Sequence, residues 1–344
     1  MKPIRIGCLL GIFLSVTVVP AAHATPQNQP ADAALAGKKA YMDTLILHQS
    51  FAEVEALLQS EPRLFEAKDI RGFTVLHTAL ASGPVKPSVP FITWLLAHGA
   101  NVNATAGDGS TPLMMAVQDK DPEIVSMFLK AGANPKVVDR NGFTALSWAS
   151  MSGFDQVASE LIKAGAEPDF FQAAQLGLTG RLTVFLRTDP KLIDAREPRS
   201  QRTALELAAM HRHAAAVRLL VSFHPTLDVY SAAVAGQNEF LRSHLTKDDP
   251  AVNARDPYTH ATPLQMAVEG GDLKTMTLLL DYGANVNAGN PGSALSAAIH
   301  SGDKEAVKLL VGRGADTKRS LPGFGNAYTM ALAMHRPDIA ELVK

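Results

Sequence analysis

The segment His98-Gly-Ala-Asn-Val-Asn-Ala104 returns almost unchanged as Tyr282-Gly-Ala-Asn-Val-Asn-Ala288. Weaker copies of its Gly-Ala core lie between and beyond these two, at Ala131–Pro135, Ala164–Pro168 and Arg313–Asp316. A chain that repeats one phrase in this way is a stack of similar structural units. The length of the repeat is therefore established first, and the helices within each unit are assigned afterwards. Function in such a stack usually lies on a surface that several units share.

A second phrase, Thr-x-Leu or Ser-x-Leu, marks the start of most units. Its leading residues are Thr74, Thr111, Thr144, Thr203, Thr262 and Ser293, spaced by 37, 33, 59, 59 and 31 residues. Each start precedes an alanine-rich stretch, a break at glycine or a polar residue, and then a leucine-rich stretch. The apolar residues recur at helical spacing in both stretches, which predicts two short helices in each unit.

Each part of the unit has a physical reason. The leading Thr or Ser can accept a backbone N–H at a helix start, and Pro112 or Pro263 suits the first helical turn. The glycine of the repeated phrase can adopt the left-handed conformation that ends a helix. Asn141-Gly142, just before the next Thr, predicts a tight hairpin between units.

This pattern resembles the ankyrin repeat, with its 33-residue period and T-P-L-H-x-A signature. Residues 74–79 (TVLHTA) and 111–116 (TPLMMA) match the signature closely, and the resemblance covers residues 36–344. It implies an all-α fold, an ankyrin-repeat solenoid of about nine to ten helix-turn-helix units with short hairpin loops. The expected units are 36–68, 69–104, 105–138, 139–168, 169–195, 196–226, 227–255, 256–288, 289–318 and 319–344.

The two 59-residue gaps are the main departure from a regular array. Each should hold two units, because Phe171–Gly177 matches Tyr230–Gly236 at an offset of 59 residues. The units at 169–195 and 227–255 are therefore short and lack the leading hairpin, as does the first unit. His224 stands where the repeat predicts a glycine, and a non-glycine residue in left-handed backbone costs about 1 kcal/mol or more.

The first 24 residues have the character of a signal peptide. Lys2 and Arg5 precede an apolar run of 14 residues, Ile6–Val19, and Ala22-His23-Ala24 forms an A-x-A cleavage site. The run is shorter than the roughly 20 apolar residues of a membrane span. We therefore expect cleavage after Ala24, a periplasmic or secreted protein with no membrane span, and a flexible polar lead over 25–35.

Composition excludes several classes of function. The single cysteine, Cys8, lies in the expected signal peptide, so the mature chain would have no disulfide and no cysteine metal site. Removal of Lys2 and Arg5 leaves 30 basic against 33 acidic residues, which gives no electrostatic footprint for nucleic acid. The sequence contains no phosphate-binding loop, nucleophile elbow, dinucleotide fingerprint or H-E-x-x-H pair. We expect no enzymatic activity, no cofactor and no bound metal.

Four histidine and asparagine residues have a functional and a structural interpretation. His211 and His213 form the one pair typical of metal ligands, but they fall at the break between two helices and lack a third ligand nearby. A metal or small-ligand site there is the less favoured alternative. His77 occupies the histidine position of the signature, which in the family forms hydrogen bonds within and between units. Asn103-Ala104-Thr105 is a formal glycosylation sequon.

Three further features of the sequence are compatible with either a packing role or a binding role. The proline-rich segment Gly83–Pro90 is either a stiff surface loop or a partner contact. Trp94 and Trp148 lie in helical apolar stripes, where packing in the core or groove is favoured over ligand stacking.

The predicted contact surface lies on the hairpins. In ankyrin-like proteins the hairpin tips and first helices form a concave binding face, and aromatic and arginine side chains are the usual anchors of protein interfaces. For Phe73 and Phe143, packing on the next hairpin is an equal alternative. The expected partner-binding residues are Ile70, Arg71, Phe73, Ser110, Arg140, Asn141, Phe143, Arg199, Arg202, Tyr258 and His260.

The sequence therefore predicts an exported, monomeric protein-protein interaction module. It would bind another protein through its concave face and hairpin tips, and would inhibit, stabilise or scaffold that partner. Bacterial ankyrin proteins similar to this chain suggest two narrower roles. One is neutralisation of a toxin delivered to the periplasm, as an immunity protein does, and the other is support of an oxidative-stress enzyme such as a catalase.

Overall fold

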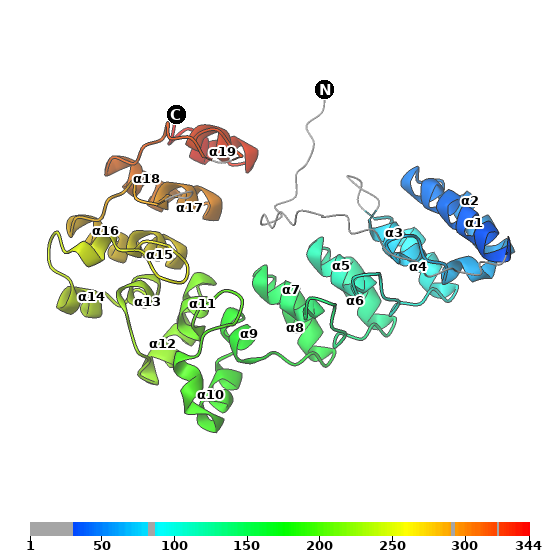
Figure 1. Cartoon of the computed structure of the whole chain (residues 1–344), viewed down its shortest axis with the longest axis horizontal. Helices are drawn as coiled ribbons and strands as arrows, with labels where there is room; N and C mark the ends of the chain where they lie inside the picture. The colour runs from blue at the N-terminus through cyan, green and yellow to red at the C-terminus, as the bar shows by residue number, and fades with distance from the viewer. Residues whose placement is uncertain (1–29, 82–86, 290–292, 322) are drawn as a thin grey trace, which may run out of the picture. The chain divides into compact units, whose positions relative to one another are not determined.

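A computed structural model describes residues 30–81, 87–289, 293–321 and 323–344. The predicted signal peptide and residues 83–86 of the proline-rich segment lie outside the described residues. Within them the chain forms 20 α-helices and no β-strand, arranged as ten successive helix pairs (Figure 1). The expected all-α solenoid of about nine to ten helix-turn-helix units is therefore confirmed.

The chain divides into two compact blocks. The N-terminal block comprises the residues up to Ala149 together with Gln156–Glu167, and the C-terminal block comprises Ser150–Asp155 with Pro168–Lys344. The helices of the first four pairs are α1 (Pro30–Leu47), α2 (Phe51–Ser60), α3 (Val75–Leu80), α4 (Val89–Ala97), α5 (Pro112–Gln118), α6 (Pro122–Lys130), α7 (Ala145–Met151) and α8 (Asp155–Lys163).

Six further pairs belong to the C-terminal block. Their helices are α9 (Phe170–Gln175), α10 (Thr179–Thr188), α11 (Ala204–Met210), α12 (Ala214–Ser222), α13 (Val229–Val234), α14 (Asn238–His244), α15 (Pro263–Gly270), α16 (Leu273–Asp281), α17 (Ala294–Ser301), α18 (Lys304–Gly312), α19 (Ala327–Ala333) and α20 (Pro337–Ala340). None of the helices that the structure describes is both long and apolar enough to cross a membrane.

The first helix differs from the expectation. α1 begins at Pro30, six residues before the predicted start of the first unit, so part of the expected flexible lead is helical. Four alanines between residues 31 and 36 explain the longer helix, because alanine has the highest intrinsic helix propensity.

The helix starts follow the predicted chemistry. Thr111 Oγ1 accepts a hydrogen bond from the Met114 N–H at 3.3 Å, with Pro112 in the first turn. Thr262 does the same for Gln265, whose side-chain oxygen in turn accepts from the Thr262 N–H at 2.9 Å. These reciprocal bonds satisfy backbone donors that a helix leaves free at its start.

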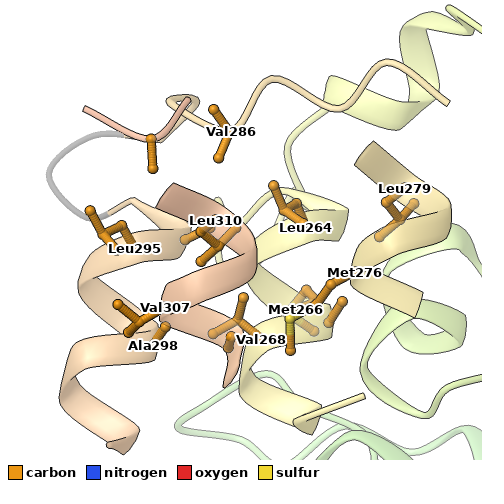
Figure 2. Packing of buried hydrophobic residues seen from close by; sticks show 14 of the residues in the cluster. Leu264, Met266, Val268, Met276, Leu279, Val286, Leu295, Ala298, Val307 and Leu310 are labelled. Carbon is orange, nitrogen blue, oxygen red and sulfur yellow. The ribbon is translucent and has the colours of Figure 1, made fainter. Parts of the chain in front are cut away.

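The core of the C-terminal block is built from both helices of each pair. Figure 2 shows Leu264 and Met266 of α15 beside Leu279 of α16, and Leu295 and Leu310 of the next pair. All five are at most 3% exposed. Full burial of such a side chain stabilises a fold by about 1.5–3 kcal/mol, so packing between neighbouring pairs dominates the stability of this block.

Both copies of the Asn-x-Asn phrase link their own unit to the next one. Asn103 Nδ2 donates to the Gly132 carbonyl at 3.1 Å, and its Oδ1 accepts from the Asn134 N–H at 2.7 Å. Asn287 makes the same two bonds, to Gly314 at 3.0 Å and from Asp316 at 2.8 Å. The Nδ2 atom of Asn103, which a glycan would occupy, is therefore engaged in joining units.

The three units without a leading hairpin share one ending. Their second helices are followed by 3-10 helices that begin at proline, at Pro62–Phe65, Pro190–Asp194 and Pro250–Asn253. His224, in the unit between the last two, has φ of 54°, in the left-handed region where Gly165 has φ of 100°. His224 thus takes the backbone conformation that the repeat assigns to glycine.

Candidate functional site

The hairpins of the N-terminal block form one hydrogen-bonded row. The hairpins span residues 69–73, 106–110 and 139–143. The Gly107 N–H donates to the Arg71 carbonyl at 2.7 Å, and the Arg140 N–H donates to the Asp108 carbonyl at 2.9 Å. Gly72 has φ of 78°, and a Cβ there would lie 2.5 Å from Gly107 N. Glycine is therefore what lets the first two hairpins approach so closely.

The first hairpin presents three of the predicted contact residues together. Ile70 is 105% exposed at its tip. The Arg71 guanidinium pairs with the Asp69 carboxylate at 2.8 Å and lies over the Phe73 ring, 4.2 Å from its centroid. Phe73 is half-buried and stacks on the His77 ring at 5.4 Å. The hairpin thus holds an aliphatic and a cationic side chain outward on an aromatic support.

Phe143 occupies the matching position on the third hairpin. It is half-buried, with its ring centroid 4.9 Å from that of Trp148. Arg140 and Asn141, beside it, are exposed, and the Asn141 N–H donates to the Asp139 carboxylate at 2.8 Å. Packing on the helix that follows each hairpin therefore accounts for part of each phenylalanine surface, and both side chains remain only half-buried.

Ser110 lies inside the row. It is 9% exposed, its hydroxyl donates to Asp108 at 2.6 Å, and its carbonyl accepts from the Ala106 N–H at 2.8 Å. The carbonyl also lies 3.3 Å from Nε2 of the fully buried His77. Ser110 therefore presents little surface to a partner. His77 has the expected structural role, and burial lowers its pKa.

Two hairpins of the C-terminal block are joined across an intervening unit. The first closes where Glu197 N–H donates to the Arg202 carbonyl at 2.8 Å, and the second where Asp256 N–H donates to the Ala261 carbonyl at 2.9 Å. The Arg196 guanidinium lies 4.1 Å from the Tyr258 ring centroid. The unit between them has no hairpin of its own, and this cation–π contact spans the gap.

Arg196 is the central cation of this region, and the sequence did not single it out. Its guanidinium lies 3.7 Å from Glu206 and 3.9 Å from Asp228, and it donates to the Gln201 carbonyl at 2.7 Å. Burial raises the pKa of the Glu206 carboxyl, which is 2% exposed. The one available signal was the arginine spacing in R-E-P-R-S-Q-R, which does not reveal which arginine faces inward.

The four predicted contact residues here differ in accessibility. Arg199 and His260 are exposed, and Tyr258 is 51% exposed. Arg202 is not available in the same way, because its side chain is 12% exposed and pairs with Glu269 of α15 at 3.1 Å. Burial raises the pKa of Glu269. Arg202 therefore serves mainly to tie its hairpin to α15.

The histidine pair has structural partners. His213 Nε2 lies 2.8 Å from the Gln175 carbonyl, and its ring fills the space above Gly177. The rings of His211 and His213 are parallel, with centroids 6.4 Å apart. In the part of the chain that the structure describes, no three His, Cys, Asp or Glu side chains gather as a metal site.

The comparisons with known proteins agree with the repeat architecture. A family model described as ankyrin repeats (3 copies) matches residues 86–172 and 229–320. No curated protein matches the chain. The matched ranges include the hairpins at 106–110, 139–143 and 256–261, and omit the whole unit that carries Arg196 and Arg202.

Proposed function

Because the chain belongs to the ankyrin-repeat family, which indicates a protein-protein interaction module, we propose that it is exported and binds one partner protein through its hairpin tips. Two features support this proposal. The first 24 residues have the layout of a signal peptide. The hairpin row of the N-terminal block holds Ile70, Arg71 and Phe73 on a fixed backbone.

The first hairpin carries the proposal. A fully exposed isoleucine beside an arginine stacked on an aromatic ring combines the apolar and cationic groups that anchor protein interfaces. The Asp69 carboxylate accepts from the backbone N–H groups of Arg71 and Phe73, both at 2.8 Å. A tip held in this way loses little conformational entropy on binding. Such binding would inhibit, stabilise or scaffold the partner without catalysis.

Site-specific crosslinking tests the surface. A photoreactive amino acid at position 70 should give one discrete crosslinked species in cells that express the full chain. The matched control is position 184, where Val184 is also aliphatic and 64% exposed but lies on the second helix α10. A tagged Ile70→Asp variant should no longer capture the partner that the tagged wild-type protein captures. A tagged Val184→Asp variant should still capture it. Equal crosslinking from both positions would rule out the tip as the contact.

Cell fractionation tests export separately. The protein should be recovered from the periplasm or medium with Thr25 as its first residue. A chain that stays in the cytoplasm and retains Met1 would overturn the proposed location and leave the binding surface to the crosslinking experiment.

A further inference from the structure

The turn between α11 and α12, His211-Arg212-His213, contacts residues of four other units. Its two histidines contact units that precede it in the chain, and its arginine contacts units that follow it. All of these contacts lie within the C-terminal block, which includes Ser150–Asp155 of the fourth unit. We call these three residues the clamp turn, because they connect the turns of units on both sides.

Arg212 makes the contacts with the following units. Its φ of 60° lies in the left-handed region, and its guanidinium lies over Gly271, where a Cβ would be 2.7 Å from Arg212 Cζ. Its Nη2 atom is 3.3 Å from the Asp303 carboxylate. The same carboxylate accepts from the Ala306 N–H at 3.0 Å at the start of α18. An arginine stays protonated in proteins, so this half of the clamp turn keeps its ion pair in mild acid.

The histidines make the contacts with the preceding units. His213 Nε2 is 2.8 Å from the Gln175 carbonyl, and its ring lies over Gly177, where a Cβ would be 2.7 Å from the ring carbon Cγ. Since a carbonyl can only accept, this Nε2 atom carries a proton and donates it. The His211 Nδ1 atom lies 3.6 Å from the position of a Cβ at Gly153. Two imidazole rings thus cover two glycine turns.

One carboxylate faces the histidine pair. Asp155, the first residue of α8, has its carboxylate 4.0 Å from His213 Nε2, and its side chain is 57% exposed. α9, which packs against α11, has no titratable side chain. The titratable side chains on the other helices that pack against α11 are exposed, neutral or directed at other partners, and they are Lys191, Asp194, Arg218, Tyr230 and Glu269. Asp155 is therefore the one acidic side chain that acts on His211 in the part of the chain that the structure describes.

Protonation of the histidine pair is unfavourable in this arrangement. The two rings are parallel, with centroids 6.4 Å apart, and Arg212 stands between them in the chain. Two imidazolium groups beside this guanidinium would repel one another, and the exposed Asp155 offsets only part of that repulsion. Burial lowers the pKa of His211 from its ordinary value of 6.5, and the neighbouring His213 lowers it further. The folded turn thus favours the neutral ring, and its stability falls as the pH drops below the ordinary value.

We propose that the clamp turn is a pH-sensitive switch. At neutral pH its histidines hold the turn at residues 153–155, and in mild acid they release that turn while Arg212 keeps its contact with Asp303. The change is therefore confined to one half of the clamp turn. No hairpin residue takes part, so the switch is independent of the proposed contact surface.

Hydrogen exchange of the full chain, followed by mass spectrometry at about pH 7.5 and about pH 5.5, tests this proposal over the range in which histidines titrate. Labelling times are scaled for the intrinsic pH dependence of amide exchange. The peptide over residues 150–155 should exchange at least about threefold faster at the lower pH, because protonation favours the released turn. The peptide over residues 301–304, which carries Asp303, should keep its rate and serves as the internal reference.

Three variants identify the group that titrates. His211→Asn, which removes the titrating ring, should make the exchange rate at residues 150–155 equal at the two pH values. Asp155→Asn removes the one counter-charge and should increase the acceleration in acid. His300→Asn is the matched control, because His300 is an exposed histidine on α17, and this variant should behave as the wild type.

Equal rates at both pH values in the wild type would overturn the proposal, as would an acceleration that persists in His211→Asn. Faster exchange that extends equally to residues 301–304 would also overturn it, because that result would show general unfolding in acid rather than the release of one turn.

Discussion

At the scale of the residue, the most unusual side chain is Lys39. It is 1% exposed on α1, and its ammonium group lies 2.5 Å from one oxygen of Asp43 and 2.6 Å from the other. Its third neighbour is Thr78 Oγ1 of α3, at 3.4 Å. A buried charge needs its counter-charge nearby, because transfer from water into the interior is strongly unfavourable.

Asp43→Ala should therefore lower the free energy of unfolding by about 3–5 kcal/mol, since it leaves the Lys39 ammonium buried without a partner. Glu61→Ala is the control, because Glu61 pairs with Lys38, whose side chain is 50% exposed, and such surface pairs contribute about 0–1 kcal/mol. Chemical denaturation followed by circular dichroism measures both. Equal small losses would show that Lys39 finds other partners or water.

His224 gives a prediction of the opposite sign. Its φ of 54° lies in the left-handed region, which costs a residue with a Cβ about 1–2 kcal/mol. His224→Gly should raise the free energy of unfolding by about 1 kcal/mol. Gly165→Ala, at φ of 100°, should lower it. An unchanged or lower stability of His224→Gly would mean that the imidazole contributes contacts that outweigh the strain.

Glu206 gives a pH dependence. Burial raises the pKa of its carboxyl above the ordinary value of 4.5, so the folded chain holds this proton more tightly than the unfolded chain. Its contribution to stability is complete below the ordinary pKa and is lost as the pH rises through the raised pKa. Glu206→Gln can keep the helix-capping bonds, as Gln265 does in its unit. The variant should lose less unfolding free energy than the wild type between pH 4 and pH 7, and equal losses would contradict this assignment.

At the scale of the element, the second helix of a unit is anchored by the apolar face that it buries against its neighbours. In α16, Leu279 is 0% exposed and Leu273 is 37% exposed. Leu279→Ala should lower the free energy of unfolding by about 2–5 kcal/mol, because it removes buried methyl groups and leaves a cavity. Leu273→Ala, in the same helix, should cost below about 1 kcal/mol. Thermal denaturation of the two variants measures both losses of stability. If the two losses are similar, this helix is not anchored by Leu279.

The elements that the sequence predicted best are those set by local chemistry. Thr111 and Thr262 cap their helices because hydroxyl, proline and following residues stand within one turn of each other. The position of the Arg196 side chain depends instead on Tyr258, two units further along the chain, because the two residues are in contact. The contact is possible because the intervening unit, 227–255, has no hairpin. Lys39 has a local signal, because Asp43 follows it by four residues in the same helix, but its burial beside Thr78 of α3 depends on the next unit. Pairings across units are decided by packing that one unit's sequence does not contain.

At the scale of the whole molecule, the two blocks can be observed separately. Both tryptophans, Trp94 and Trp148, belong to the N-terminal block. Because contacts in a repeat stack are made with neighbouring units, damage at α16 should stay local. In Leu279→Ala, unfolding monitored by tryptophan fluorescence should match the wild type, while circular dichroism should show an earlier transition. A fluorescence midpoint shifted as far as the dichroism midpoint would show a single cooperative chain.

The two segments that each hold two units, 169–226 and 227–288, also have matching backbone conformations. Gln201 and His260 are 59 residues apart and have φ of 57° and 58°, and Gly177 and Gly236 have φ of 64° and 66°. α9 and α13 are both six residues long and both start at an aspartate cap, Asp169 and Asp228. A duplication of 59 codons would create this pattern in one step. Copying or deleting one such 59-residue segment would leave each helix beside a neighbour of the same type.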